Sequence, residues 1–149
     1  MLQLPLPKGY DRDVLIRAIG TAKDVDNLSG ITSVFSPTVA TVVSVLALCG
    51  KQLSDFKNIR IVGNGFLVGA PIARFCTAHA IPYMVADIDT KDMEEFVHDG
   101  DLIITGVGKT GVANPDWLLD DTAVIDFGCP PDFDQDFLAR NEGRLAFYT

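Results

Sequence analysis

After residue 58, short apolar runs alternate with segments of helical periodicity. Four such runs stand at Ile59–Val62, Tyr83–Ala86, Leu102–Thr105 and Ala123–Asp126. Glycine or aspartate closes or follows each run, and Pro71–His79 and Asp92–His98 between them place apolar residues at helical spacing. Because buried parallel strands are short and need a helical crossover between them, this pattern predicts an α/β fold. The expected architecture is a Rossmann-like, doubly wound parallel sheet.

Two more helices are predicted before the first of these strands. Tyr10–Ile19 carries apolar residues at helical spacing, with Asp11 as its N-cap and Gly20 as its terminator. Thr38–Cys49 is a valine-rich run whose composition alone would suit a strand. Its length, the proline before it and the glycine after it favour a helix, with Ser36 as the cap.

Three further segments have weaker patterns. Met1–Pro7 begins as a strand-like alternation and contains two prolines, which end a strand. Thr90 is the predicted cap of the helix Asp92–His98. Phe137–Thr149 is predicted to form a short helix followed by a strand at Leu145–Tyr148.

The turn after the first strand has the spacing Gly63-x-Gly65-x-x-x-Gly69, one residue longer than the dinucleotide pattern G-x-G-x-x-G. Glycine suits this chemistry because the turn needs dihedral angles that a Cβ disfavours, and because a pyrophosphate must approach bare backbone N–H groups. Asp87 lies eighteen residues after Gly69, where a strand-end carboxylate can bind ribose hydroxyls. The alternative is a plain α/β core with a solvated Asp87 and no ligand.

Glycine or aspartate recurs at the ends of the predicted strands. In an open parallel sheet, ligands bind at the carboxyl ends of strands, near the point where the strand order reverses. Gly63–Gly69, Asp87, Gly106–Gly108 and Gly128 would therefore converge at one edge of the sheet. This convergence predicts a nucleotide site more specifically than any single turn does.

The composition narrows the choice of partners. A net charge of −8 argues against nucleic acid and anionic membranes, since both attract basic surfaces. The chain has neither an apolar run of membrane-spanning length nor a signal-peptide pattern at its start, so a cytoplasmic location is expected. Cys49, Cys76 and Cys129 form no C-x-x-C pair and are expected to be small buried hydrophobes. No metal site is predicted.

Several motifs, taken in order along the chain, resemble the bifunctional methylenetetrahydrofolate dehydrogenase/methenyltetrahydrofolate cyclohydrolase family. The family reads Q-L-P-L-P, K-D-V-D-G, V-x-G-x-S-x-x-V-G-x-P, V-G-K and V-I-D-V-G-I-N. The matching segments here are Gln3–Pro7, Lys23–Asn27, Ile61–Pro71, Val107–Lys109 and Val124–Pro130. Order and spacing agree across nearly the whole chain.

The resemblance implies a two-domain enzyme with a folate cleft. It implies oxidation of 5,10-methylenetetrahydrofolate by a nicotinamide cofactor and hydrolysis of the methenyl product to 10-formyltetrahydrofolate. Residues 1–37 would be a remnant of a preceding α/β catalytic domain, and residues 38–149 the Rossmann-like NAD(P)-binding domain. By the family's pattern, Gln3 would assist a catalytic lysine and Asp26 would hold the pterin, although a solvated loop is the plainer interpretation of the Asp26 segment. Family members commonly dimerise through the Rossmann-like domain, which implies a homodimer.

The implied cofactor-binding residues follow the strand ends. They are Gly63, Asn64, Gly65, Phe66, Leu67, Val68, Gly69, Asp87, Ile88, Gly106, Val107, Gly108, Asp126, Gly128 and Cys129. Many family members carry arginine and serine at the positions of Asn64 and Gly65 and Ser-Arg after the second strand, and they use NADP. A carboxylate such as Asp87 repels a 2′-phosphate and accepts a hydrogen bond from a free 2′-hydroxyl, so NAD is favoured over NADP.

Departures from the family leave several hypotheses open. The family's Tyr-x-x-x-Lys motif, which supplies the cyclohydrolase lysine, occurs nowhere in the 149 residues, and neither does its P-G-G-V-G-P segment. Asn27 stands where the family has glycine. The chain is then a fragment of a longer enzyme or a minimal relative that keeps the dehydrogenase better than the cyclohydrolase. The alternatives are a non-catalytic dinucleotide-binding module that needs a partner chain, and an α/β domain without a ligand.

Overall fold

The computed structural model describes residues 2–140, 143 and 145–148, with no side chains described at 147 and 148. The chain forms two compact units, which divide between Pro37 and Thr38.

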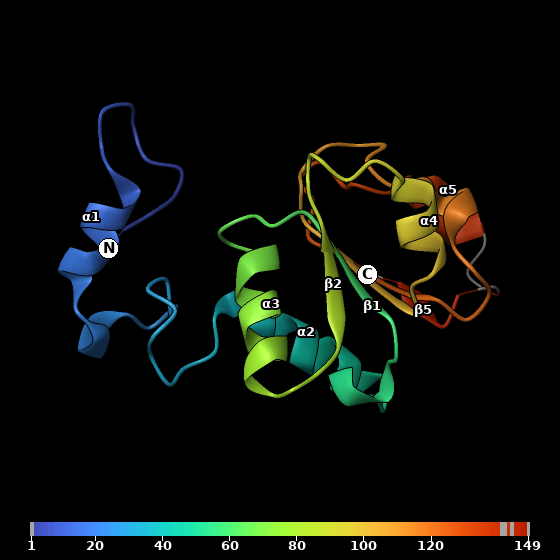
Figure 1. The fold of residues 1–149 in the computed structure, drawn as a ribbon, viewed down its shortest axis with the longest axis horizontal. Coiled ribbons are helices and arrows are strands. Elements are labelled where there is room, and N and C mark those ends of the chain that lie inside the picture. The colour runs from blue at the N-terminus through green and yellow to red at the C-terminus, as the bar shows by residue number, and fades with distance from the viewer. Residues whose placement is uncertain (1, 141–142, 144, 149) are drawn as a thin grey trace. The chain divides into compact units, whose positions relative to one another are not determined.

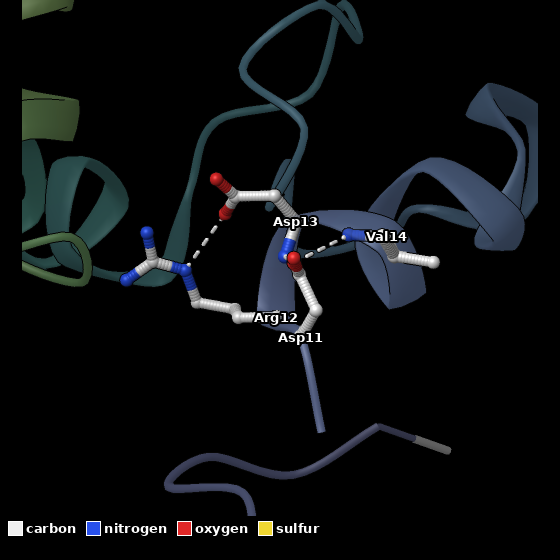
Figure 2. Close-up of polar contacts among 4 residues, drawn as sticks. All are labelled: Asp11, Arg12, Asp13 and Val14. Carbon is white, nitrogen blue, oxygen red and sulfur yellow. Dashed lines mark hydrogen bonds and ion pairs between the residues drawn. The ribbon is translucent and has the colours of Figure 1, made fainter. Parts of the chain in front are cut away.

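The first unit contains helix α1, Arg12–Ile19, which starts two residues after the predicted Tyr10 but has the predicted N-cap, Asp11, and the predicted terminator, Gly20. The Asp11 side chain caps it by accepting hydrogen bonds from the backbone N–H groups of Asp13 at 2.9 Å and Val14 at 3.0 Å (Figure 2). Such a cap satisfies donors that have no partner inside the helix. Gly20 ends the helix with a φ of 73°, a left-handed conformation that glycine adopts without strain.

The rest of the first unit is turns, apart from the short 3₁₀ helix η1, Thr21–Lys23. Leu2–Pro7 forms no strand, so the strand-like interpretation of this segment was wrong. Its prolines donate no backbone hydrogen bond, and the residues described in this unit offer no strand to pair with it.

The second unit is built on a parallel sheet, as predicted. Its strands are β1 Ile59–Val62, β2 Tyr83–Ala86, β3 Leu102–Thr105, β4 Ala123–Asp126 and β5 Phe147–Tyr148. They lie in the order β2-β1-β3-β4-β5. The chain therefore moves outward from β1 to β2, returns across β1 to β3, and continues the other way. The strand order reverses between β1 and β3, which is the switch point of a doubly wound sheet.

Helices cover both faces of the sheet (Figure 1). Helices α2, Pro37–Leu48, and α3, Gly69–Ala78, pack on one face around Ile59 and Ile61. Helices α4, Met93–His98, and α5, Gln135–Arg140, pack on the other around Ile103 and Val124. The strands β1, β3 and β4 are buried on both faces, which explains why they read as continuous apolar runs rather than as alternating patterns, whereas the edge strand β2 exposes Met84.

Two short 3₁₀ helices complete the second unit, η2 at Leu53–Asp55 and η3 at Pro115–Trp117. η3 forms a single turn that ends at Trp117. Among the helices in the described part of the chain, none combines the length and the apolar character needed to cross a membrane.

Two local predictions about residues outside the core were wrong. Asp92, rather than Thr90, caps α4 by accepting a hydrogen bond from the backbone of Glu95 at 3.0 Å. Cys49 and Cys129 are exposed, and only Cys76 is buried as expected. Cys49 follows the last turn of α2 and Cys129 follows the exit of β4, so neither lies on a face that packs against the sheet.

Candidate functional site

The register of the sheet aligns the carboxyl ends of its four longer strands. Val62 pairs with Ala86 and with Thr105, and Thr105 pairs with Asp126. The loops that follow these residues therefore leave the sheet at the same edge. This edge lies across the switch point between β1 and β3, where open parallel sheets bind their ligands.

The glycines of the turn after β1 differ in what surrounds them. Gly63 has a φ of 91°, and a Cβ there would lie 2.8 Å from a methyl of Val107. A Cβ on Gly69 would lie 1.9 Å from the carbonyl oxygen of Gly63, so only glycine lets α3 start this close to the strand. A Cβ on Gly65 would meet nothing within 4 Å. Gly63 and Gly69 therefore serve the turn, whereas Gly65 borders open space.

The turn after β1 packs against the turn after β3. A Cβ on Gly106 would lie 2.6 Å from a methyl of Val68, and Val107 in turn lies over Gly63. The hydroxyl of Thr38, at the start of α2, donates a hydrogen bond to the carbonyl of Leu67 at 2.9 Å. Neighbouring elements thus hold the glycine turn from both sides.

The turn after β2 presents Asp87 at the end of its strand. The Asp87 carboxylate accepts a hydrogen bond from the backbone N–H of Asp89 at 3.0 Å, and the backbone N–H of Asp87 donates to the hydroxyl of Thr90 at 2.9 Å. Thr90 therefore closes this turn instead of capping α4. Ile88, the residue after Asp87, is 99% exposed, so packing within this chain does not account for its apolar side chain.

Exposed apolar side chains recur along this edge. Leu67, Ile88 and Val107 belong to three different strand-end loops, and each is about half exposed or more. In the glycine turn Asn64 is exposed, whereas Phe66 and Val68 are half buried. Apolar side chains beside a polar turn suit the flat rings of a dinucleotide.

The loop after β4 is organised by Asp126. Its half-buried carboxylate accepts hydrogen bonds from the backbone N–H groups of Gly128 at 2.7 Å, Asp132 at 2.8 Å and Phe133 at 3.0 Å. Burial raises the pKa of Asp126, the nearby Asp132 carboxylate raises it further, and these hydrogen bonds oppose the rise. A carboxylate with three backbone donors shapes its own loop, which suggests support of the site rather than contact with a ligand.

No motif in the sequence marks Asp132, which lies in the same loop and is fully buried. Its partners are on the loop after β3, more than twenty residues away along the chain. No local pattern signals such long-range contacts. Gly108 also joins the two loops, because a Cβ there would lie 3.3 Å from the carbonyl oxygen of Cys129.

Gln3 and Asp26, the residues with implied catalytic roles, both lie in the first unit, and both are exposed. The loop that carries Asp26 is held by its neighbours. The buried Asp24 carboxylate accepts the backbone N–H groups of Leu28 and Ser29, each at 2.8 Å. The Asn27 side chain donates to the carbonyl of Val34 at 2.9 Å, and its backbone has a φ of 51°. Asparagine tolerates this left-handed conformation, which explains how it can stand in for the family's glycine.

The charge of Asp24 makes the loop sensitive to acid. Burial alone would raise the pKa of Asp24, but hydrogen bonds from Ser29 and Leu28 outweigh it and hold the pKa below its ordinary value. Because the pKa of Asp24 is lower in the folded chain than in the unfolded chain, the charged carboxylate stabilises the folded loop at pH values above the unfolded pKa. This stabilisation is lost as the pH falls through the folded pKa. We expect the Leu28 and Ser29 amides to lose protection from hydrogen exchange below about pH 4.

The matched variants for this prediction are Asp24→Asn and Asp26→Asn. Asp24→Asn is expected to weaken amide protection already at neutral pH and to flatten its acid dependence. Asp26→Asn removes an exposed carboxylate from the same loop and should leave the amide protection and its acid dependence unchanged. The same acid dependence in Asp24→Asn as in the unaltered chain would contradict the role assigned to Asp24.

The remaining candidate groups show no metal-binding arrangement. Within the described residues, histidine, cysteine, aspartate and glutamate side chains form no cluster that could hold a metal ion. Burial raises the pKa of the Cys76 thiol to about 11, so this cysteine is a neutral, apolar group at physiological pH.

Comparison with known proteins places these features in a family. The family described as tetrahydrofolate dehydrogenase/cyclohydrolase, NAD(P)-binding domain, matches residues 36–143. A bifunctional protein FolD from Gluconacetobacter diazotrophicus is 34% identical over 136 residues, covering 86% of this chain and 44% of the relative. A FolD from Rhodopseudomonas palustris is 29% identical over 160 residues, covering 99% of this chain and 53% of the relative. The chain thus spans about half the length of these relatives.

Solved structures agree with this fold. A bifunctional 5,10-methylenetetrahydrofolate dehydrogenase/cyclohydrolase from Thermoplasma acidophilum superposes with a TM-score of 0.85 at 23% identity, over 100% of this chain and 58% of the other. A FolD from Trypanosoma brucei, solved with NADP cofactor and inhibitor, gives 0.83 at 24% identity, over 99% of this chain and 57% of the other. Because the family's pattern covers most of the second unit and the fold agrees along the chain, this protein belongs to the tetrahydrofolate dehydrogenase/cyclohydrolase family.

Proposed function

We propose that the chain binds a nicotinamide dinucleotide at the carboxyl edge of its sheet, as the cofactor-binding part of a methylenetetrahydrofolate dehydrogenase. The observation that carries the proposal is the contrast among the turn glycines. Gly63 and Gly69 are needed by the turn itself, whereas no packing contact requires a glycine at Gly65. Open space beside a strand–helix turn is what a pyrophosphate needs. Leu67, Ile88 and Val107 offer apolar surface for the rings.

We infer the positions of the two halves of the dinucleotide from the strand order. Asp87 follows β2, on the outer side of β1, and would accept hydrogen bonds from the adenosine ribose. The turn after β1 would take the pyrophosphate, and the loops after β3 and β4 would face the nicotinamide half. When bound, the cofactor supplies the hydride acceptor for oxidation of 5,10-methylenetetrahydrofolate. Hydride transfer needs alignment of the two rings rather than a protein acid or base.

The first unit is proposed to supply folate contacts. Asp26 is exposed on a loop that Asp24 and Asn27 hold in shape, so its carboxylate can accept hydrogen bonds from a pterin ring. Gln3 would lie beside the folate by the family's pattern. The family's cyclohydrolase lysine has no counterpart among these 149 residues, so we assign none of them to hydrolysis of the methenyl product.

A second candidate function is a non-catalytic dinucleotide-binding module that acts with a partner chain. Exposed apolar side chains in the first unit favour this candidate, since surface of this kind commonly meets another polypeptide. These side chains are Val25, Ile31, Val34 and Phe35. An absorbance assay at 340 nm with 5,10-methylenetetrahydrofolate and NAD separates the two candidate functions. A rate of absorbance increase that is proportional to the chain's concentration supports the dehydrogenase. Saturable NAD binding without turnover supports the module.

We propose further that the site prefers NAD to NADP. Asp87 stands directly after β2, and the two residues that follow it, Ile88 and Asp89, carry no positive charge. A 2′-phosphate beside Asp87 would meet like charge, whereas a free 2′-hydroxyl can donate to it. We expect calorimetric titration of Asp87→Asn to show NAD affinity about tenfold lower than that of the unaltered chain.

Asp89→Asn is the matched control, because it removes the same charge from the same turn without touching the strand-end carboxylate. It should leave NAD affinity within about twofold of the unaltered chain. Equal losses of NAD affinity in Asp87→Asn and Asp89→Asn would mean that net charge, rather than a ribose contact, sets the affinity. NADP binding more tightly than NAD to the unaltered chain would contradict the proposed preference.

A further inference from the structure

The loop after β4 contains a charged side chain with no access to solvent. Asp132 stands between Pro131 and Phe133, and its exposed fraction is 0%. Within the described residues no lysine, arginine or histidine makes a salt bridge with it. Burying a carboxylate without a cation costs free energy unless hydrogen-bond donors surround it. The structural role of the Asp132 carboxylate can therefore be inferred from the groups that donate hydrogen bonds to it.

Within the described part of the chain, the hydrogen-bond donors to the Asp132 side chain come from the end of β3 and the loop after it. Oδ2 accepts hydrogen bonds from the Thr105 hydroxyl and from the backbone N–H of Val107, the latter at 2.7 Å. Oδ1 accepts the backbone N–H of Lys109 at 2.8 Å. The backbone carbonyl of Asp132 accepts the N–H of Gly111 at 3.0 Å. The loop after β3 is thus wrapped around one residue of the loop after β4.

Asp132 is itself fixed from the β4 side. Its backbone N–H donates to the Asp126 carboxylate at 2.8 Å. A Cβ on Gly128 would lie 2.7 Å from Asp132 Oδ1, so only glycine leaves room for the carboxylate at this point. The Asp126 carboxylate therefore holds the backbone of Asp132, and the Asp132 carboxylate holds the loop after β3. Together the two residues connect the exits of β3 and β4.

The loop after β3, which Asp132 holds, includes Val107, a residue that lines the proposed site. Val107 donates one of these hydrogen bonds from its backbone N–H, and its half-exposed side chain lies against Gly63 in the turn after β1. The loops after β3 and β4 are the ones proposed to face the nicotinamide half of the dinucleotide. Asp132 does not need to touch a ligand to act on it, because it sets where Val107 and Gly108 stand.

We propose that Asp132 is a positioning residue for the nicotinamide half of the cofactor, an inference that rests on the proposed dinucleotide-binding function. The adenosine half is proposed to bind at the turns after β1 and β2, which make no hydrogen bond with the Asp132 side chain. Loss of the carboxylate should therefore change binding of the whole dinucleotide more than binding of its ADP-ribose part.

The test compares dissociation constants of NAD and ADP-ribose, measured by calorimetry on the full chain and its variants. Asp132→Asn replaces an acceptor oxygen by an NH₂ group that faces an N–H donor, and is expected to weaken NAD about tenfold or more. Its ADP-ribose affinity should stay within about threefold of the unaltered chain. A general loss of structure would weaken both ligands in the same ratio, so the NAD to ADP-ribose ratio isolates positioning.

Thr105→Val and Thr105→Ser keep the test decisive if Asp132→Asn does not fold. Thr105→Val removes the hydroxyl donor and should weaken NAD about threefold to fivefold, whereas Thr105→Ser keeps the donor and should restore the affinity. An unchanged NAD to ADP-ribose ratio in Asp132→Asn and Thr105→Val would overturn the positioning role alone. A folded, unaltered chain that binds neither ligand would overturn the proposed function and this inference with it.

Discussion

Gly69→Ala is expected to abolish dinucleotide binding and to destabilise the second unit. The added Cβ would stand 1.9 Å from the carbonyl oxygen of Gly63 and 3.2 Å from Cα of Asn64. Both neighbours are backbone, so no side-chain rotation can relieve the clash, and either α3 or the turn must move. We expect the free energy of unfolding to fall by about 3 kcal/mol or more, measured by urea denaturation. Binding is read by calorimetric titration with NAD.

Gly65→Ala is the matched control for the fold, because it places the same methyl in the same turn. A Cβ there would meet nothing within 4 Å, so stability should change by less than about 1 kcal/mol. Any loss of NAD affinity in this variant would then come from the ligand's space rather than from unfolding. A Gly69→Ala chain as stable as the unaltered one, with full NAD affinity, would contradict the turn geometry described above.

Leu46→Ala is expected to lower the free energy of unfolding by about 2–5 kcal/mol, as for other truncated, fully buried leucines. Leu46 is 0% exposed and belongs, with Val39 and Val42, to the stripe of α2 that packs on the sheet. Its loss would leave a cavity between the helix and the sheet. Urea denaturation followed by circular dichroism measures the change.

The same helix offers the matched control two residues further on. Leu48 is 88% exposed, so Leu48→Ala removes the same atoms from water-facing surface. Its stability should stay within about 0.5 kcal/mol of the unaltered chain. Comparable losses for both leucines would show that α2 does not pack through the stripe that contains Leu46.

Helix α2 illustrates what can and what cannot be predicted from the sequence. The run Thr38–Cys49 is apolar on nearly every side, so its periodicity does not show which face is buried. Its length and its bounding proline and glycine identified a helix, and α2 spans Pro37–Leu48. The buried face of the helix is decided by contact with the sheet. The exposures of Leu46 and Leu48 could not be told apart from the sequence.

Features that depend on local rules were predictable. All four longer strands begin and end where their apolar runs do, and three of them, β1, β3 and β4, are buried on both faces. Asp11 and Gly20 delimit α1 as their cap chemistry requires. The meeting of the strand ends at one edge also followed from the sequence, because parallel strands in this topology share their direction.

Features that depend on distant partners were not predictable. Asp132 lies in a proline- and acid-rich loop and resembles a surface residue until Thr105, Val107 and Lys109 are seen around it. Thr90 has a residue type suited to a cap, but its hydroxyl is taken by the backbone N–H of Asp87. In each case a contact in space outweighs a local preference.

Calorimetric titration of the folded, unaltered chain with NAD tests directly whether the carboxyl edge of the sheet binds a dinucleotide. We expect saturable binding at a single site, weakened by Asp87→Asn and lost in Gly69→Ala. Absence of binding of both NAD and NADP by a chain shown to be folded would contradict the claim that the carboxyl edge of this sheet is a dinucleotide site. The glycine turn would then be a feature of packing alone.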